Sequence, residues 1–123
     1  MFETVRKGDI EAVKRIERRI GLDVQYLIDG NTKQNANFAA MKIVNENDAI
    51  NMIQWLVGKG CQIKLTDDWD QTCLYYAARD GRTNTVQCLL ELDVEMNHVD
   101  TFGQTAFFYS CREGHFDTCK LLI

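Results

Sequence analysis

Two stretches of the chain, residues 67–90 (DDWDQTCLYYAARDGRTNTVQCLL) and residues 100–123 (DTFGQTAFFYSCREGHFDTCKLLI), match each other at an offset of 33 residues without a gap. The offset pairs Asp67 with Asp100, Gln71 with Gln104, Thr72 with Thr105, Gly81 with Gly114, and Leu89 with Leu122. A fixed period of roughly 20–50 residues is typical of proteins built from stacked structural repeats. We therefore expect a chain made of several copies of one small unit.

Weaker copies precede these two. Residues 34–57 (QNANFAAMKIVNENDAINMIQWLV) lie one further period upstream, and there Ile53 and Leu56 fall under Val86 and Leu89. An earlier copy, RKGDIEAVKRI at residues 6–16, aligns if the first loop is about seven residues longer than the others. We predict a single domain over residues 1–123, with repeats at about 1–33, 34–66, 67–99 and 100–123, the last one truncated.

Each unit is expected to be a pair of helices. Thr72 and Thr105 precede stretches with helical periodicity, where a threonine can cap the helix N-terminus. Gly81 and Gly114 follow about nine helical residues later, where a left-handed residue ends a helix. Apolar residues then return at helical spacing. Such a pair cannot bury its own apolar face, so neighbouring units must cover it.

These features resemble the ankyrin repeat, whose pattern is a D-x-x-G-x-T finger, a T-P-L-H-x-A-A helix, a G-H turn and a V-x-x-L-L helix. The matching residues are Asp100, Gly103, Thr105, Gly114, His115, Leu121 and Leu122 in the fourth repeat, and Asp67, Thr72, Leu74, Ala77, Ala78, Gly81, Val86 and Leu89 in the third. The resemblance covers all 123 residues and is strongest over 67–123. It implies an all-α solenoid of about four helix-turn-helix repeats with short β-hairpin fingers.

The chain also departs from that pattern. It contains no proline, and the family's proline position at each inner helix start holds Ala40, Cys73 and Ala106. We expect these helix starts to be less preorganised. The family histidine, which ties the helix start to the next finger, is replaced by Tyr75, whose hydroxyl can act similarly, and by Phe108, which cannot. The second repeat has Ala39 at the threonine position, so we expect it to lack a cap and to be locally weaker.

The resemblance places Trp69 and Phe102 in one position of the finger, facing the family's concave binding surface. The predicted partner-binding residues are Asp68, Trp69, Gln71, Arg79 and Asp80 in the third repeat and Thr101, Phe102, Gln104, Arg112 and Glu113 in the fourth. The same positions in the second repeat hold Asn35, Ala36, Phe38, Glu46 and Asn47. Exposed aromatic and arginine side chains dominate binding hot spots. The alternative is that both aromatic rings pack against neighbouring fingers.

Charge is unevenly distributed. Residues 1–33 have seven Lys/Arg and six Asp/Glu, whereas residues 34–123 have seven and twelve. The acidic repeats favour a basic peptide or protein partner and argue against nucleic-acid binding. The basic run Lys14, Arg15, Arg18 and Arg19 has two interpretations, a solvated helix face or, less favoured, a docking patch. No apolar run is long enough to span a membrane.

The residues that could carry chemistry are few. The five cysteines are an odd number without a CxxC pair, which is typical of a reduced cytoplasmic or nuclear protein. Four of them (Cys73, Cys88, Cys111 and Cys119) fall at small or apolar positions of the repeat, and Cys61 follows Gly60 in a loop where partial exposure is expected. Ser110, the only serine, takes a position between helices, and Asp67, Asp68 and Asp70 lack the further ligands of a calcium loop. We expect no catalytic site, cofactor or metal.

We predict a protein-protein interaction module. The chain stops at Ile123, directly after an apolar segment that should pack inside a solenoid, so we expect it to be the N-terminal part of a larger multidomain protein. By analogy, such a protein could carry a methyltransferase, palmitoyltransferase or kinase domain. The alternative is a stand-alone ankyrin regulator or inhibitor of a kinase or a cytoskeletal protein. An enzyme within these residues is disfavoured by the shortage of candidate groups.

Overall fold

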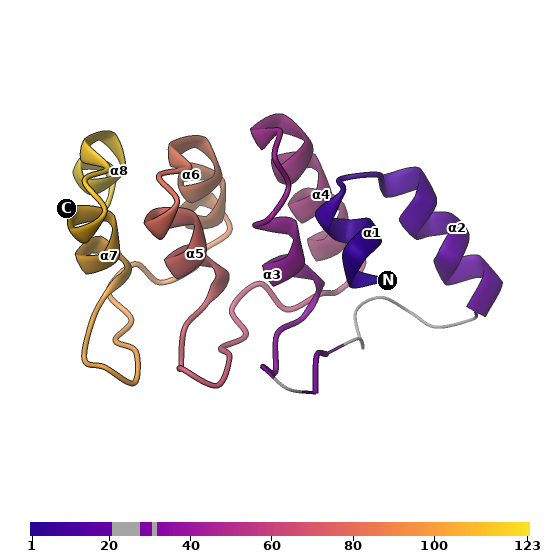
Figure 1. Ribbon diagram of the computed structural model, residues 1–123, viewed down its shortest axis with the longest axis horizontal. Helices are drawn as coiled ribbons and strands as arrows, with labels where there is room; N and C mark the ends of the chain where they lie inside the picture. The colour runs from indigo at the N-terminus through magenta and orange to yellow at the C-terminus, as the bar shows by residue number, and fades with distance from the viewer. Residues whose placement is uncertain (21–27, 31) are drawn as a thin grey trace. The chain divides into compact units, whose positions relative to one another are not determined.

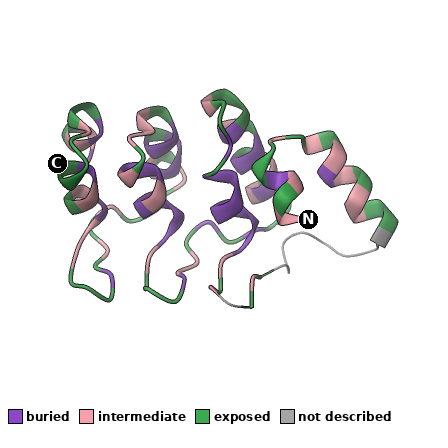
Figure 2. Ribbon diagram, in the orientation of Figure 1, coloured by how far each residue is buried: buried purple, intermediate pink, exposed green. Residues whose placement is uncertain are grey.

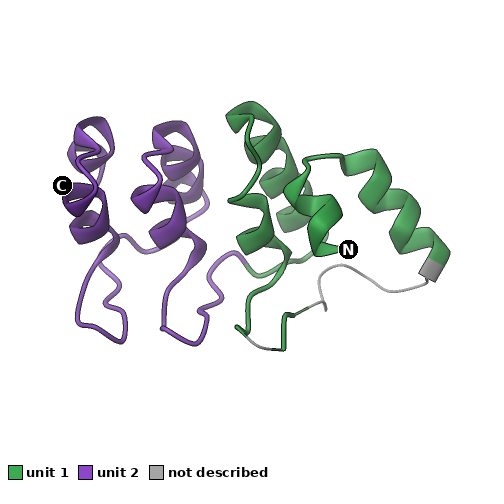
Figure 3. Cartoon of the chain, in the orientation of Figure 1, with its two compact units in different colours: residues 1–62 green, residues 63–123 purple. Residues whose placement is uncertain are grey.

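The computed structural model describes residues 1–20, 28–30 and 32–123. The chain divides into two compact units, residues 1–62 and residues 63–123 (Figure 3). The described residues form helices joined by turns and loops, and the only β pairing among them is an isolated bridge between Ile28 and Asn35. The all-α fold class predicted from the repeat is confirmed.

The described part of unit 1 contains two helix pairs. Helices α1 (Phe2–Arg6) and α2 (Ile10–Ile20) are followed by α3 (Ala36–Ala40) and α4 (Glu46–Gly58), and α1 packs against α3 (Figure 1). The apolar residues of α4 that the repeat predicts to be buried, Ile53 and Leu56, are both fully buried. Gly8 joins α1 to α2 with a φ of +78°, as expected at the turn inside a repeat.

Unit 2 repeats this arrangement with α5 (Cys73–Arg79), α6 (Thr83–Glu91), α7 (Ala106–Arg112) and α8 (Phe116–Leu121). Helix α5 packs against α7, and α6 packs against α8. Ala77 and Ala78 are completely buried, and their small side chains suit the close packing of α5 against α6 and α7. Burial is high along α5 and lower along α7 and α8 (Figure 2), since α7 and α8 are covered on one side only within this unit.

The turns inside the two repeats of unit 2 are built alike. Gly81 and Gly114 have φ values of +68° and +76°, as predicted for residues that end a helix in the left-handed region. After Gly81, the N–H of Arg82 donates to the carbonyl of Ala77 at 3.0 Å, and after Gly114 the N–H of His115 donates to Ser110 at 2.9 Å. These bonds satisfy carbonyl groups at the helix ends that would otherwise lack donors.

The second repeat does not keep the 33-residue register throughout. Helix α4 ends at Gly58, which is 33 residues before the end of α6, but α3 begins at Ala36, four residues before Ala40, where the register places it. The prediction of a missing cap is therefore wrong. Asn35 is the N-cap residue of α3, and its side chain accepts the N–H of Asn37 at 3.1 Å.

The predicted threonine caps also need correction. Thr72 and Thr105 do occupy the N-cap positions of α5 and α7 with extended backbone, but neither side chain accepts a capping hydrogen bond. The Thr72 hydroxyl is buried and has no hydrogen-bond partner. The position of each helix start was predicted correctly, whereas the interaction proposed to stabilise it is absent.

The cysteine predictions hold for Cys73 and Cys88, which are buried, and are wrong for two others. Cys61 is buried rather than partly exposed, because Gly60 ends α4 in the left-handed region and the N–H of Cys61 then bonds to Leu56 at 3.0 Å, turning its side chain inward. Cys111 is exposed, although the equivalent Ala78 is fully buried. Ala78 lies under α7, while no later helix of residues 63–123 covers Cys111.

We expect Gly81→Ala to destabilise the protein by at least about 1 kcal/mol more than Gly103→Ala. Both residues have positive φ, so both variants incur the strain of an alanine in the left-handed region, about 1–2 kcal/mol. An added Cβ at Gly81 would in addition lie 2.6 Å from Cγ and 2.8 Å from Cε1 of His115, whereas at Gly103 it meets no atom within 4 Å. Urea unfolding followed by circular dichroism measures the difference, and equal losses would contradict the His115 contact.

Candidate binding surface on the fingers

Each finger of unit 2 is a loop folded around one buried aspartate. In the fourth repeat, one carboxylate oxygen of Asp100 accepts the backbone N–H groups of Phe102 and Gln104, both at 2.9 Å. The other oxygen accepts the hydroxyl of Tyr109 at 2.5 Å and the side-chain amide of Gln71 at 2.8 Å. These four donors compensate for the lost hydration of a residue that is only 5% exposed.

Asp67 does the same in the third repeat. One oxygen accepts the N–H groups of Trp69 at 3.0 Å and Gln71 at 3.1 Å, and the other accepts the hydroxyl of Tyr76. Asp70 then takes a φ of +56° in the position held by Gly103, as its tolerance of left-handed geometry predicts. The two loops therefore share a hydrogen-bond pattern as well as a sequence pattern.

The two fingers are joined side by side. The N–H of Thr101 donates to the carbonyl of Trp69 at 3.0 Å, and the ring of His98 contacts the carbonyl of Asp70 at 2.8 Å. The hydroxyl of Tyr75 reaches the backbone carbonyls of His98 and Gln104, which confirms that it replaces the family histidine. Burial raises the pKa of Tyr75 well above its ordinary value, so the hydroxyl stays protonated and remains a donor.

Behind each finger, an arginine lies over a tyrosine ring. The guanidinium carbon of Arg79 is 5.0 Å from the ring centre of Tyr76, and that of Arg112 is 4.9 Å from the ring centre of Tyr109. Arg79 also pairs with Asp80 at 3.3 Å, and Arg112 pairs with Glu113 at 3.0 Å. The sequence pattern does not distinguish the two tyrosines from other helix residues, although they share one position of the 33-residue register.

We call the ten predicted residues the finger face. Seven are exposed, namely Asp68, Trp69, Asp80, Thr101, Phe102, Arg112 and Glu113, and three are half-buried, namely Gln71, Arg79 and Gln104. Trp69 and Phe102 are 41% and 63% exposed, which are high values for large aromatic side chains. The amide of Gln71 is engaged with Asp100 and Tyr109, so this residue also joins the two repeats.

The corresponding residues of the second repeat are arranged differently. Asn35, Ala36 and Phe38 are buried, because α3 starts four residues earlier than the register places it and carries them into the core. Glu46 and Asn47 lie in the first turn of α4, half-buried and exposed respectively. The expectation that this set forms part of the exposed binding surface is wrong for the three buried residues.

The protonation states of Asp100 and Tyr109 favour the hydrogen bonds of the finger. Loss of hydration at Asp100 disfavours its charged form, but the hydrogen bonds from Tyr109, Gln71 and the N–H groups of Gln104 and Phe102 outweigh it, so the pKa of this carboxyl lies below its ordinary value. The pKa of Tyr109 is raised, by burial and by the same hydrogen bond to Asp100. Near neutral pH the pair is therefore a carboxylate and a protonated phenol.

A family model described as ankyrin repeats (3 copies) matches residues 37–123, which is most of the chain. The chain belongs to the ankyrin-repeat family. A comparison with curated proteins finds no match. Ankyrin repeats are generally protein-protein interaction modules and are typically non-enzymatic. In this ankyrin chain, the fingers of unit 2 carry the exposed aromatic residues Trp69 and Phe102.

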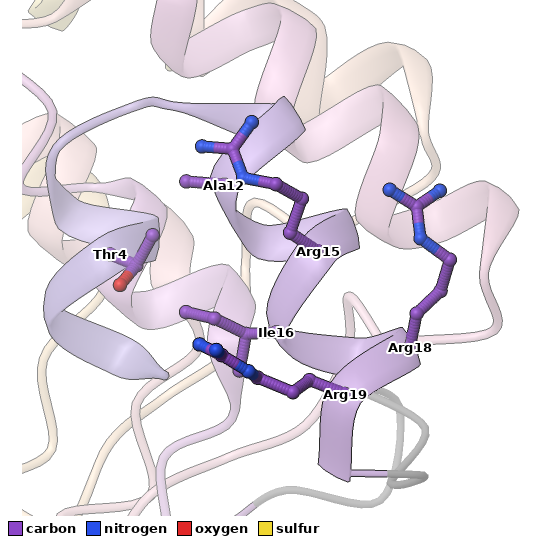
Figure 4. A pocket seen from close by; sticks show the side chains of 6 residues that line it. All are labelled: Thr4, Ala12, Arg15, Ile16, Arg18 and Arg19. Atoms are coloured by element: carbon purple, nitrogen blue, oxygen red, sulfur yellow. The ribbon is translucent and has the colours of Figure 1, made fainter.

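A second surface of the ankyrin chain lies in unit 1, where α1 and α2 form a shallow groove (Figure 4). The groove is lined by Thr4, Ala12, Arg15, Ile16, Arg18 and Arg19. The three arginine side chains are exposed, while Lys14 forms an ion pair with Glu11 at 3.2 Å. This arrangement agrees with the favoured interpretation of the basic run as a solvated helix face.

Neither a metal-binding cluster nor a membrane-spanning helix occurs in the described part of the chain. It contains no group of three or more histidine, cysteine or acidic side chains arranged to hold a metal ion. Its helices are also too short or too polar to cross a membrane. Ser110 is fully buried, as predicted from its position between helices, and its hydroxyl donates to the carbonyl of Phe107 at 2.8 Å.

We expect Asp100→Asn to lower the free energy of unfolding at pH 7 by about 1–3 kcal/mol, because the new amide has one acceptor oxygen and cannot accept all four donors that the carboxylate accepts. The pKa of Asp100 is lower in the folded state than in the unfolded state, where it is about 3.9. Its stabilising contribution is thus complete above that unfolded value and is lost as the pH falls through the folded one.

Urea unfolding of both proteins between pH 7 and pH 3 tests this expectation. The difference between wild type and variant should narrow below about pH 4. Glu95→Gln, which neutralises an exposed carboxylate outside the fingers, is the matched control and should follow the wild-type curve. A constant difference across the pH range would show that the charge of Asp100 does not contribute.

Proposed function

We propose that this ankyrin domain binds a protein or peptide partner through the finger face, with Trp69 and Phe102 as its apolar anchors. The observation that carries the proposal is the exposure of both aromatic side chains on loops whose backbones are fixed by hydrogen bonds. Preorganised loops lose little conformational entropy on binding. Apolar rings held on such loops can therefore contribute most of their buried area to affinity.

The alternative, that the rings pack on neighbouring fingers, fits the exposures less well. Phe102 is 63% exposed, and Phe108, in the next helix, is paired edge-to-face with Tyr109 rather than with either finger ring. The two fingers are instead joined by backbone and amide hydrogen bonds. These hydrogen bonds between repeats do not use the side chains of Trp69 or Phe102, which leaves both rings available for a partner.

The charges around the rings favour a basic partner. The finger face and the adjoining Asp70 contain two guanidinium groups, Arg79 and Arg112, and four exposed carboxylates, Asp68, Asp70, Asp80 and Glu113. Both arginines are already paired with an adjacent acid. Complementary charge accelerates association and disfavours wrong partners. We propose a peptide or loop that presents an apolar side chain flanked by lysine or arginine.

The same finger face would serve either a recognition module within a larger protein or a stand-alone regulator of a kinase or cytoskeletal protein. Substitution of Trp69 and Phe102 tests partner binding in either context. The reducing cytoplasm or nucleus remains our proposal for its location, from the pattern of its cysteines.

The proposal predicts that Trp69→Ala and Phe102→Ala each weaken binding about tenfold or more, which corresponds to more than about 1.4 kcal/mol, with the thermal midpoint within a few degrees of wild type. A random peptide library displayed on phage and selected on the wild-type chain supplies the ligands. Their dissociation constants are then measured by calorimetry for each variant.

Phe116→Ala is the matched control, because Phe116 is an exposed aromatic residue (68%) of the same unit that lies outside the finger face. The Phe116→Ala variant should bind the selected peptides with wild-type affinity. The selected sequences should also be enriched in lysine and arginine. Equal losses of affinity in all three variants would refute the finger face as the binding surface. Retention of wild-type affinity in both finger variants would refute it as well. Unfolding of both finger variants would show that their rings are packing residues.

A further inference from the structure

Two thiols of unit 2 lie in direct contact. Cys111, near the end of α7, and Cys119, in α8, have their sulfur atoms 3.0 Å apart. A disulfide bond is about 2.05 Å long, so only a small approach of the two sulfurs is needed. Cys111 is exposed and Cys119 is half-buried, so a small molecule can reach the first and the first can reach the second.

The hydrogen bonds around the pair determine which atom each thiol proton points to. The single hydroxyl proton of Ser110 is donated to the carbonyl of Phe107 at 2.8 Å, so the hydroxyl oxygen, 3.3 Å from the sulfur of Cys119, is left to accept. The proton of Cys119 then points to Ser110, and the proton of Cys111 points to the sulfur of Cys119. This chain of donors holds the two sulfurs facing each other.

The other three cysteines lack this access. Cys61, Cys73 and Cys88 are buried. Burial keeps a dissolved reagent away from these three sulfurs, and loss of hydration also raises the pKa of the Cys73 thiol to about 12 and raises that of Cys88. Reaction with a dissolved reagent is therefore confined to the pair on α7 and α8.

We propose that Cys111 and Cys119 form a redox-active dithiol that low-molecular-weight disulfides, such as oxidised glutathione, convert to an intramolecular disulfide. The thiolate of Cys111 attacks one sulfur of the reagent and releases the first glutathione thiolate. The thiolate of Cys119 then attacks the sulfur of Cys111 in the mixed disulfide and releases the second. The protein loses two protons and two electrons, and one oxidised glutathione becomes two reduced molecules.

The hydrogen bond to Cys119, together with loss of hydration, raises the pKa of Cys111 above its ordinary value. The thiolate fraction therefore grows with pH, and the reaction should be faster in mildly alkaline buffer than at neutral pH.

Formation of the disulfide would change the surface around the two cysteines. Phe107, Phe116 and Ile123 line an apolar hollow together with the two cysteines. A disulfide would replace two thiols in the wall of this hollow, and it would join α7 to α8 across the turn at 113–115. Because the cross-link restricts the unfolded chain, the thermal midpoint should rise on oxidation.

The test treats the fully reduced chain with oxidised glutathione in native buffer, quenches with acid, and determines the intact mass. We expect a loss of two hydrogens with no retained glutathione, and maleimide labelling of three of the five thiols under denaturing conditions. Trypsin should then yield peptide 83–112 linked to peptide 113–120. Because peptide 83–112 also contains Cys88, the digestion is repeated with Cys88→Ser, which should form the same link.

Cys119→Ser should stop at the first step and retain one glutathione on Cys111. If that variant does not fold, the wild-type mass and the Cys88→Ser digest still decide the question. The proposal fails if wild type keeps glutathione on Cys111 with Cys119 free, if the link involves another cysteine, or if all five thiols remain reduced.

Discussion

A buried carboxylate needs hydrogen-bond donors to replace water, and in residues 63–123 that requirement organises both fingers. Asp67 and Asp100 each accept two backbone N–H groups of their own loop and one tyrosine hydroxyl of the following helix. The backbone bonds give the finger its shape, and the tyrosine bond attaches that finger to its helix. The exposed aromatic residue and the arginine above the tyrosine are positioned as a consequence.

The 33-residue register predicts most of this unit correctly. It identifies the finger aspartates, the left-handed Gly81 and Gly114, the buried Ala77 and Ala78, and the helix starts. It fails where neighbouring structure decides the outcome. Cys111 has the register position of Ala78 but is exposed, because burial at that position comes from the next helix pair and not from the residue itself. Periodicity in a sequence reports equivalent positions and not whether a neighbour covers them.

The second repeat shows a different limit. An alignment without gaps places the end of its outer helix and the buried Ile53 and Leu56 correctly, but α3 and α4 both begin four residues before the positions that the register gives them. Asn35 is a good cap, and the low apolar contrast of ANFAA leaves the helix start to local capping rather than to periodicity. The tyrosines beneath Arg79 and Arg112 were missed for a related reason. Their shared position was visible, but the direction of a ring toward an aspartate nine residues earlier is a property of the folded loop.

The bond from Gln71 to Asp100 has a consequence for how such a chain can change in length. Donor and acceptor lie in different repeats, and both the third and the fourth repeat contain one residue of each kind in the same position. Duplicating a whole repeat therefore supplies a new donor together with a new acceptor, so every shared bond can be made again. Inserting a single residue between them shifts one partner relative to the other and leaves a buried carboxylate short of a donor. Gains and losses of sequence in this region are for that reason tolerated most readily in steps of 33 residues.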